Sequence, residues 1–310
     1  MARVGLVYHP RYLDHDTGEH PERAQRLIAI LARLKQDGLY DKLVAIEPEA
    51  AREEDLLRVH TQEHVDAIKE ACRRGEEFLD VDTVISPESF DVALLAAGGA
   101  KLACQKVIEG EVDRAFCLVR PPGHHATASR AMGFCLFNNI AIAARFLQQQ
   151  YNLSRILIVD WDLHHGNGTQ DIFYDDPSVF YLSCHQGNHY PFSGYEREKG
   201  RGKGEGFTLN VPLAAFSNER TIVDLFGQAL RKAAAFKPQF VLVSAGFDAH
   251  RLDPLGNLTL TEAGYAKLSQ LVCHLAKQSC QGKLVSCLEG GYNLEALAAS
   301  VAAHIEVLLH

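Results

Sequence analysis

The sequence lacks the features that would assign it to three large classes of protein. No apolar run approaches the roughly 18 residues of a membrane span, so we expect no transmembrane segment. Basic residues are not in excess, since 31 Lys and Arg stand against 39 Asp and Glu, which argues against a general nucleic-acid binder. The eight cysteines include no C-x-x-C pair, so we expect reduced core cysteines and no cysteine zinc site.

The amino-terminal segment also lacks a targeting signal. MARVGLVYHP has only a short apolar patch and no cleavage site, so it is interpreted as a first strand and not as a signal peptide. We therefore expect a cytoplasmic protein with no membrane partner and no nucleic-acid partner. The sequence does not indicate the oligomeric state.

Short apolar runs alternate with amphipathic segments along all 310 residues. The alternation predicts one α/β domain, residues 1–310, with a mostly parallel sheet and helices on both faces. Residues 194–206, rich in glycine and charge, are interpreted as a flexible surface loop. The predicted strands are 4–8, 115–119, 156–159, 179–182, 208–211, 240–244 and 283–288. The predicted helices are 20–38, 88–110, 137–152, 218–238, 261–278 and 293–309.

Polar segments follow five of the predicted strands. Ligands of open α/β sheets bind at the carboxyl ends of the strands, so one edge of the sheet should gather these segments. They are RPPGHHA, DWDLHHGNG, SCHQGNHYPFSG, AGFDAH and EGGYN.

Three of these residues have the chemistry of a metal site. Asp162 and His164 form a D-x-H pair, and i and i+2 side chains point the same way in an extended chain. Asp248 is the best third ligand. Two carboxylates and one imidazole would balance a divalent ion and leave one coordination position open, as in zinc hydrolases. Alternatively, Asp162 caps a helix and His164 is an ordinary loop histidine.

The adjacent His124 and His125 are candidates for general base and general acid near a metal-bound water. Each needs an acceptor to fix its tautomer, and Asp160 and Asn167 are available in the metal loop. Because one acceptor is charged and the other neutral, the two histidines should titrate differently. A pair of solvated loop histidines is the alternative.

Aromatic residues complete the candidate site. Tyr292, after two glycines, could donate its hydroxyl to a developing oxyanion, although core tyrosines are common after such turns. Phe134 and Tyr190 could wall a narrow apolar channel, or they could be core residues.

In this order, RPPGHHA, GFCLFN, DWDLHHGNGTQ, SAGFDAH and LEGGYN resemble the zinc-dependent histone deacetylase and acetylpolyamine amidohydrolase superfamily. The likeness runs from HPER near residue 20 to EGGYN near residue 292. It implies the arginase/deacetylase fold, a single α/β domain around an eight-stranded parallel sheet. It also implies a hydrolase that releases acetate, or a related acid, from the ε-amine of lysine.

The resemblance assigns a role to each candidate. It implies one zinc ion held by Asp162, His164 and Asp248. The resemblance also implies that His125 is the base and then the acid, and that His124, backed by Asp160, is its electrostatic partner. Tyr292 would polarise the acyl oxygen. The substrate wall would be formed by Phe134, Tyr190 and Gly133. Asn167 stands where some branches have aspartate, which resembles class II. A structural potassium ion would lie at Asp160, the main chain of Asp162 and His164, Ser183 and Cys184.

The segment RLDPLGN bears on the choice of substrate. The related polyamine deacetylase has glutamate between Asp-Pro and Gly, where this sequence has Leu255. The tubulin-type lysine deacetylase also has leucine at this position. We therefore expect acylated lysine in a peptide or protein, with an acetylated polyamine as the alternative. An arginase-like enzyme with two manganese ions is disfavoured by Asn167 and the single D-x-H. A non-catalytic acyl-lysine binder is disfavoured by the complete set of catalytic positions.

Overall fold

A computed structural model describes residues 2–310. Its main sheet has eight parallel strands in the order β2-β1-β5-β10-β9-β6-β7-β8, as the resemblance implies. The strands are β1 (Val4–Val7), β2 (Leu43–Ile46), β5 (Arg114–Cys117), β6 (Ile156–Asp160), β7 (Val179–Gln186), β8 (Thr208–Leu213), β9 (Phe240–Ala245) and β10 (Leu284–Leu288). An antiparallel hairpin, β3 (Phe78–Asp80) and β4 (Thr83–Val84), forms a second, separate sheet.

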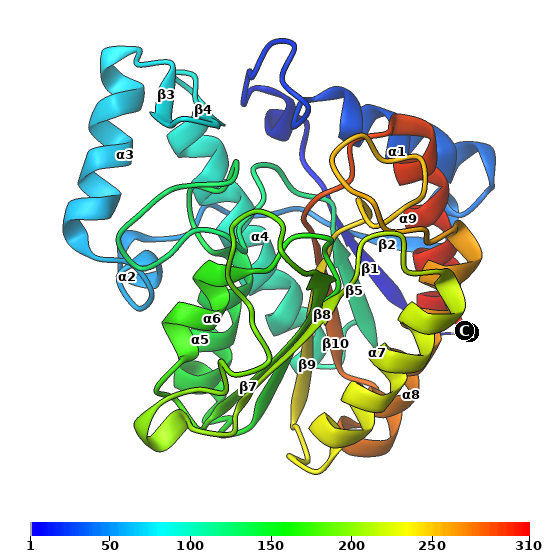
Figure 1. Ribbon diagram of the computed structural model, residues 1–310. Coiled ribbons are helices and arrows are strands. Elements are labelled where there is room, and N and C mark those ends of the chain that lie inside the picture. The colour runs from blue at the N-terminus through cyan, green and yellow to red at the C-terminus, as the bar shows by residue number, and fades with distance from the viewer. Residues whose placement is uncertain (1) are drawn as a thin grey trace.

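Helices cover both faces of the sheet (Figure 1). One layer contains α1 (Gln25–Gln36), α7 (Glu219–Ala234), α8 (Glu262–Cys280) and α9 (Leu294–Leu309). The other side holds α2 (Glu53–Leu56), α3 (Gln62–Arg74), α4 (Ser89–Ile108), α5 (Asn139–Tyr151) and α6 (Asn167–Phe173). Short 3-10 segments lie at Pro10–Leu13, Tyr40–Lys42 and Gly202–Gly204. Within residues 2–310, no helix is long and apolar enough to cross a membrane.

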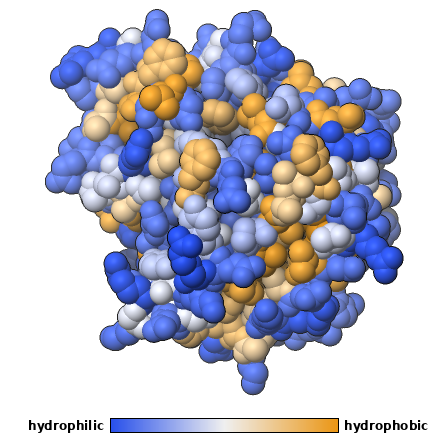
Figure 2. All heavy atoms as spheres, viewed as in Figure 1, coloured by the Kyte–Doolittle hydropathy of each residue, from blue (hydrophilic) through white to orange (hydrophobic). Residues whose placement is uncertain are grey.

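Burial explains why the strands were recognisable as apolar runs. Every residue of β6, β7, β9 and β10 is buried, because helices cover both faces of the central strands. All eight cysteines are free and buried, as expected. The surface in Figure 2 is mostly hydrophilic, with apolar side chains in separate groups.

The structure differs from the predicted helices and strands in several places. Strand β2, at the edge of the sheet, was missed although LVAI is an apolar run; it is only four residues long and lies between Lys42 and Glu47. Helix α1 begins at Gln25 and not near residue 20, and Pro21 lies in the turn before it. Helices α2, α3 and α6 were also not predicted.

Candidate active site

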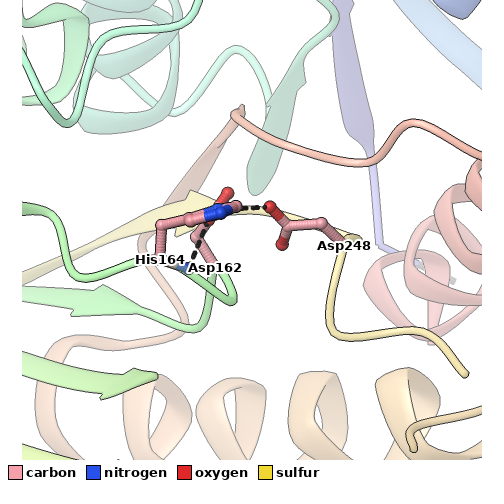
Figure 3. Close-up of side chains that lie close together, drawn as sticks. All are labelled: Asp162, His164 and Asp248. Atoms are coloured by element: carbon pink, nitrogen blue, oxygen red, sulfur yellow. Dashed lines mark hydrogen bonds and ion pairs between the residues drawn. The ribbon is translucent and has the colours of Figure 1, made fainter. Parts of the chain in front are cut away.

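The predicted metal ligands meet at the carboxyl end of the sheet. Asp162 and His164 follow β6, and Asp248 follows β9, its neighbour in the sheet. Figure 3 shows the imidazole of His164 between the two carboxylates, with Nδ1 at 3.2 Å from Asp162 Oδ1 and 3.0 Å from Asp248 Oδ2. All three side chains are buried, and one potential ligand atom from each lies within 4.8 Å of the others.

The cluster fits a divalent cation. Among the ion pairs of residues 2–310, only histidines pair with Asp162 and Asp248. A histidine is charged only when it is protonated, and two buried carboxylates are unfavourable without a positive charge beside them. Burial and the charge of Asp162 raise the pKa of Asp248 to about 7. Burial also acts to raise the pKa of Asp162, but His124 and His164 hold it below its ordinary value. Two oxygens and one nitrogen are a zinc-type donor set.

Two glycines keep the space beside these carboxylates open. A Cβ atom on Gly246 would lie 2.0 Å from Asp162 Oδ2, and one on Gly290 would lie 2.2 Å from Asp248 Oδ2. The backbone N–H of Gly290 donates to Asp162 Oδ2 at 2.8 Å. Main-chain contacts therefore fix the carboxylates without occupying the site.

The histidine pair has the two partners that the sequence suggested. His124 Nδ1 lies 3.0 Å from Asp160 Oδ2, and His125 Nδ1 lies 2.8 Å from Asn167 Oδ1. Burial acts to lower the pKa of His124, but the charges of Asp160 and Asp162 outweigh it and raise that pKa to about 10. Burial, with the charges of His124 and His164, holds the pKa of His125 well below 6.5. The pair thus combines a cationic with a neutral imidazole.

A pocket of about 180 Å³ leads to this cluster. Phe134 and Tyr190 both line it. The ring centroid of Phe134 lies 5.8 Å from that of Tyr292, and the ring centroid of Tyr190 lies 5.3 Å from that of His125. A Cβ atom on Gly133 would lie 2.4 Å from the His125 ring, so only glycine leaves that ring its place. The pocket is lined by Asp82, His125, Gly133, Phe134, His164, His189, Tyr190, Leu255 and Tyr292.

Of the other two lining residues, His189 was not predicted, whereas Asp82 was considered only as one of several acidic residues that could attract a polyamine at the rim. His189 precedes the predicted Tyr190, so its position in NHYPF was an available signal. Asp82 lies in the turn of the β3–β4 hairpin, and no apolar run precedes it that would identify a strand end. Its Oδ1 accepts a hydrogen bond from Gly133 N at 3.2 Å, so it also supports the substrate wall.

The residues predicted to hold potassium lie beside the metal cluster. Asp160 and Ser183 are register partners on β6 and β7, and Cys184 is the next residue along β7. Asp160 Oδ1 accepts from Asp162 N at 3.1 Å, and the hydroxyl of Ser183 lies 2.8 Å from His185 Nδ1. The potassium ion itself stays a prediction.

The chain is similar in sequence and in fold to known deacetylases. Residues 20–308 match the histone deacetylase domain. "Histone deacetylase 14, chloroplastic" of Arabidopsis thaliana is 42% identical over 100% of this chain and 78% of its own length. "Polyamine deacetylase HDAC10" of Homo sapiens is 41% identical over 99% of this chain and 48% of its own length. The "Crystal Structure of HDA15 HD domain" superposes with a TM-score of 0.93 at 41% identity, covering 99% of this chain and 88% of that one.

Proposed function

The chain belongs to the histone deacetylase family, whose members are hydrolases of acetyl-lysine amides, and we propose that it removes acetyl or related acyl groups from lysine ε-amines in peptides or proteins. The observation that carries this proposal is the pocket of about 180 Å³, which has aromatic walls and leads to an Asp-His-Asp cluster and a histidine pair. A pocket of this volume suits an unbranched side chain better than a bulky one.

We propose one zinc ion per chain at Asp162, His164 and Asp248, and a structural potassium ion near Asp160 and Ser183. When bound, zinc supplies a Lewis acid that polarises the acyl oxygen and lowers the pKa of water. The cytoplasmic location is also a proposal, since a similar plant protein is described as chloroplastic.

The protein side chains would then handle protons and charge. His125 is neutral, its Nδ1 is engaged by Asn167, and its Nε2 is left to take a proton from water and return it to the departing amine. His124, held cationic by Asp160, lies beside it with ring centroids 4.0 Å apart and stabilises negative charge. Burial raises the pKa of Tyr292 well above 10, so its hydroxyl keeps the proton that it donates to the oxyanion.

Leu255 supports lysine over polyamine as the substrate. It lines the pocket with an apolar side chain, which offers nothing to a second ammonium group. A specific observation favours the alternative, an acetylpolyamine amidohydrolase: the carboxylate of Asp82 also lines the pocket. That group already accepts a hydrogen bond from Gly133, so we rank the polyamine second.

The deciding experiment compares kcat/KM for an acetyl-lysine peptide with that for N8-acetylspermidine, on protein whose zinc content has been measured. We expect acetate release from both to require zinc and the peptide to be preferred. Preference for acetylspermidine would reverse the substrate assignment, and no release from either would refute the proposed function.

A further inference from the structure

Tyr292 follows two glycines, so its own segment gives it little conformational restraint. Gly291 has a φ of 123°, and a Cβ atom there would lie 2.7 Å from Leu297 Cδ1, so no bulkier residue can replace it. The position of the tyrosine must therefore be fixed by contacts from elsewhere in the fold.

Two buried charged side chains supply those contacts. On one side, Arg26 donates from Nε to the carbonyl oxygen of Gly291 at 2.7 Å and from Nη2 to that of Glu289. On the other side, Asp253 Oδ2 accepts from the backbone N–H of Tyr292 at 2.7 Å and from that of Asn293 at 3.3 Å. The segment is thus held by its carbonyl oxygens and by its N–H groups.

The second carboxylate oxygen of Asp253 reaches a different wall of the pocket. Oδ1 accepts from the backbone N–H of Leu255 at 3.0 Å, which closes the turn that carries Leu255 into the pocket. Asp253 is only 8% exposed, and no ion pair within residues 2–310 includes it. Asn293 caps the amino terminus of α9, where the helix dipole favours a negative charge.

We infer that Asp253 is a positioning residue that fixes Tyr292 and Leu255 relative to each other through these three hydrogen bonds. The inference deepens the proposed function and rests on it. One carboxylate would then couple the wall that selects the substrate to the group that stabilises the oxyanion. A small displacement of a reacting group is costly: about 1 Å reduces rates by about a hundredfold.

Two substitutions separate the two halves of the bridge. Asp253→Asn is isosteric but can present only one oxygen, so it loses the bond to Leu255 or those to Tyr292 and Asn293. Asp253→Ser keeps one oxygen that can accept from the N–H of Leu255, two residues ahead, but it has no second oxygen for Tyr292. We expect Asp253→Ser to reduce kcat on an acetyl-lysine peptide about tenfold or more, with little change in KM.

A double-mutant comparison distinguishes positioning from general destabilisation. If Asp253 acts through Tyr292, Asp253→Ser should cost nothing further in a Tyr292→Phe background. An equal loss in both backgrounds would overturn the inference. Asp55→Asn is the matched control, because Asp55 is also a buried aspartate and is bonded to Lys101 and Arg58, outside the pocket. It should reduce stability and leave kcat unchanged.

Amide hydrogen exchange tests the same inference without catalysis. Exchange of the Tyr292 and Asn293 amides should become at least about tenfold faster in Asp253→Ser, while that of Leu255 stays slow. Unchanged exchange at Tyr292 would overturn the positioning role. If wild type releases no acetate, the proposed function fails, and the exchange result still decides whether Asp253 holds the tyrosine.

Discussion

His125 Nδ1 lies 2.8 Å from the side-chain oxygen of Asn167, so the candidate base is oriented by a neutral amide and not by a carboxylate. A neutral acceptor fixes the tautomer of the ring without strongly stabilising its protonated form. Burial and the charge of the neighbouring His124 can therefore keep the pKa of His125 low.

Asn167→Asp should shift the pH dependence of the reaction. A carboxylate at this distance favours the imidazolium form and raises the pKa of His125. Because the neutral form is the base, the rise of kcat/KM with pH should move upward by about one unit or more. Asn152→Asp, at the exposed end of α5, is the control. An unmoved profile in Asn167→Asp would show that another group is the base.

Tyr292→Phe should retain its metal and fold and lose at least about a hundredfold in kcat, the usual loss for one oxyanion donor. The phenyl ring can still pack 5.8 Å from Phe134, and only the hydroxyl is removed. Steady-state kinetics and elemental analysis on the same preparation measure both effects. Wild-type turnover in this variant would remove the hydroxyl from the mechanism.

Asp162→Ala should lose zinc and activity together, because it leaves two ligands and removes one of the two buried negative charges. Elemental analysis after dialysis should find far less than one zinc per chain. The comparison is Asp224→Ala, an exposed acid on α7. Full occupancy in Asp162→Ala would refute the ligand assignment.

Leu255→Glu should move selectivity toward the polyamine. A carboxylate at this wall of the pocket can pair with a second ammonium group that leucine cannot bind. We expect the ratio of kcat/KM for N8-acetylspermidine to that for acetyl-lysine peptide to rise about tenfold, or about 1.4 kcal/mol. Leu255→Gln controls for size without charge. An equal shift in both variants would exclude charge pairing as the cause.

Acid should destabilise the fold through Glu22. This buried carboxylate pairs with Arg120 at 2.6 Å and with Arg26 at 3.1 Å. Burial acts to raise the Glu22 pKa, but Arg120 outweighs it and lowers it from 4.5 to about 2. The unfolded chain therefore takes up the proton first as pH falls.

The stability that Glu22 contributes is present above pH 4.5 and is lost as pH falls toward 2. The free energy of unfolding, measured with urea across this range, should change by up to about 1.4 kcal/mol per pH unit because of Glu22 alone. Glu22→Gln should be less stable at pH 7 and should lack that part of the slope. Equal slopes in both proteins would assign the acid sensitivity to other residues.

The sequence predicted that side chains following buried strands would lie together. Asp162, His164 and Asp248 come directly after continuous apolar runs, and parallel strands bring such residues to one edge. For Phe134 and Tyr190 the sequence left two interpretations, channel wall or core, and only the resemblance of their motifs to a family favoured the wall. Periodicity alone did not distinguish them from core aromatics.

Glu289 was not predicted, because it acts through long-range contacts with the main chain. Glu289 is wholly buried and accepts from the backbone of Gly123 and His124, a contact between segments more than 160 positions apart. Local patterns contain no information about partners at that distance.

The strand order has a consequence for synthesis on the ribosome. β10 is the last strand to be made, yet it lies between β5 and β9. Without residues 284–288, β2-β1-β5 and β9-β6-β7-β8 have no strand between them, and each group would present an open edge of the kind that invites aggregation. The histidine pair follows the first half, and the metal ligands follow strands of the second. On this topology the histidine pair and the metal-site cluster can take their places in one sheet only after β10 has been made.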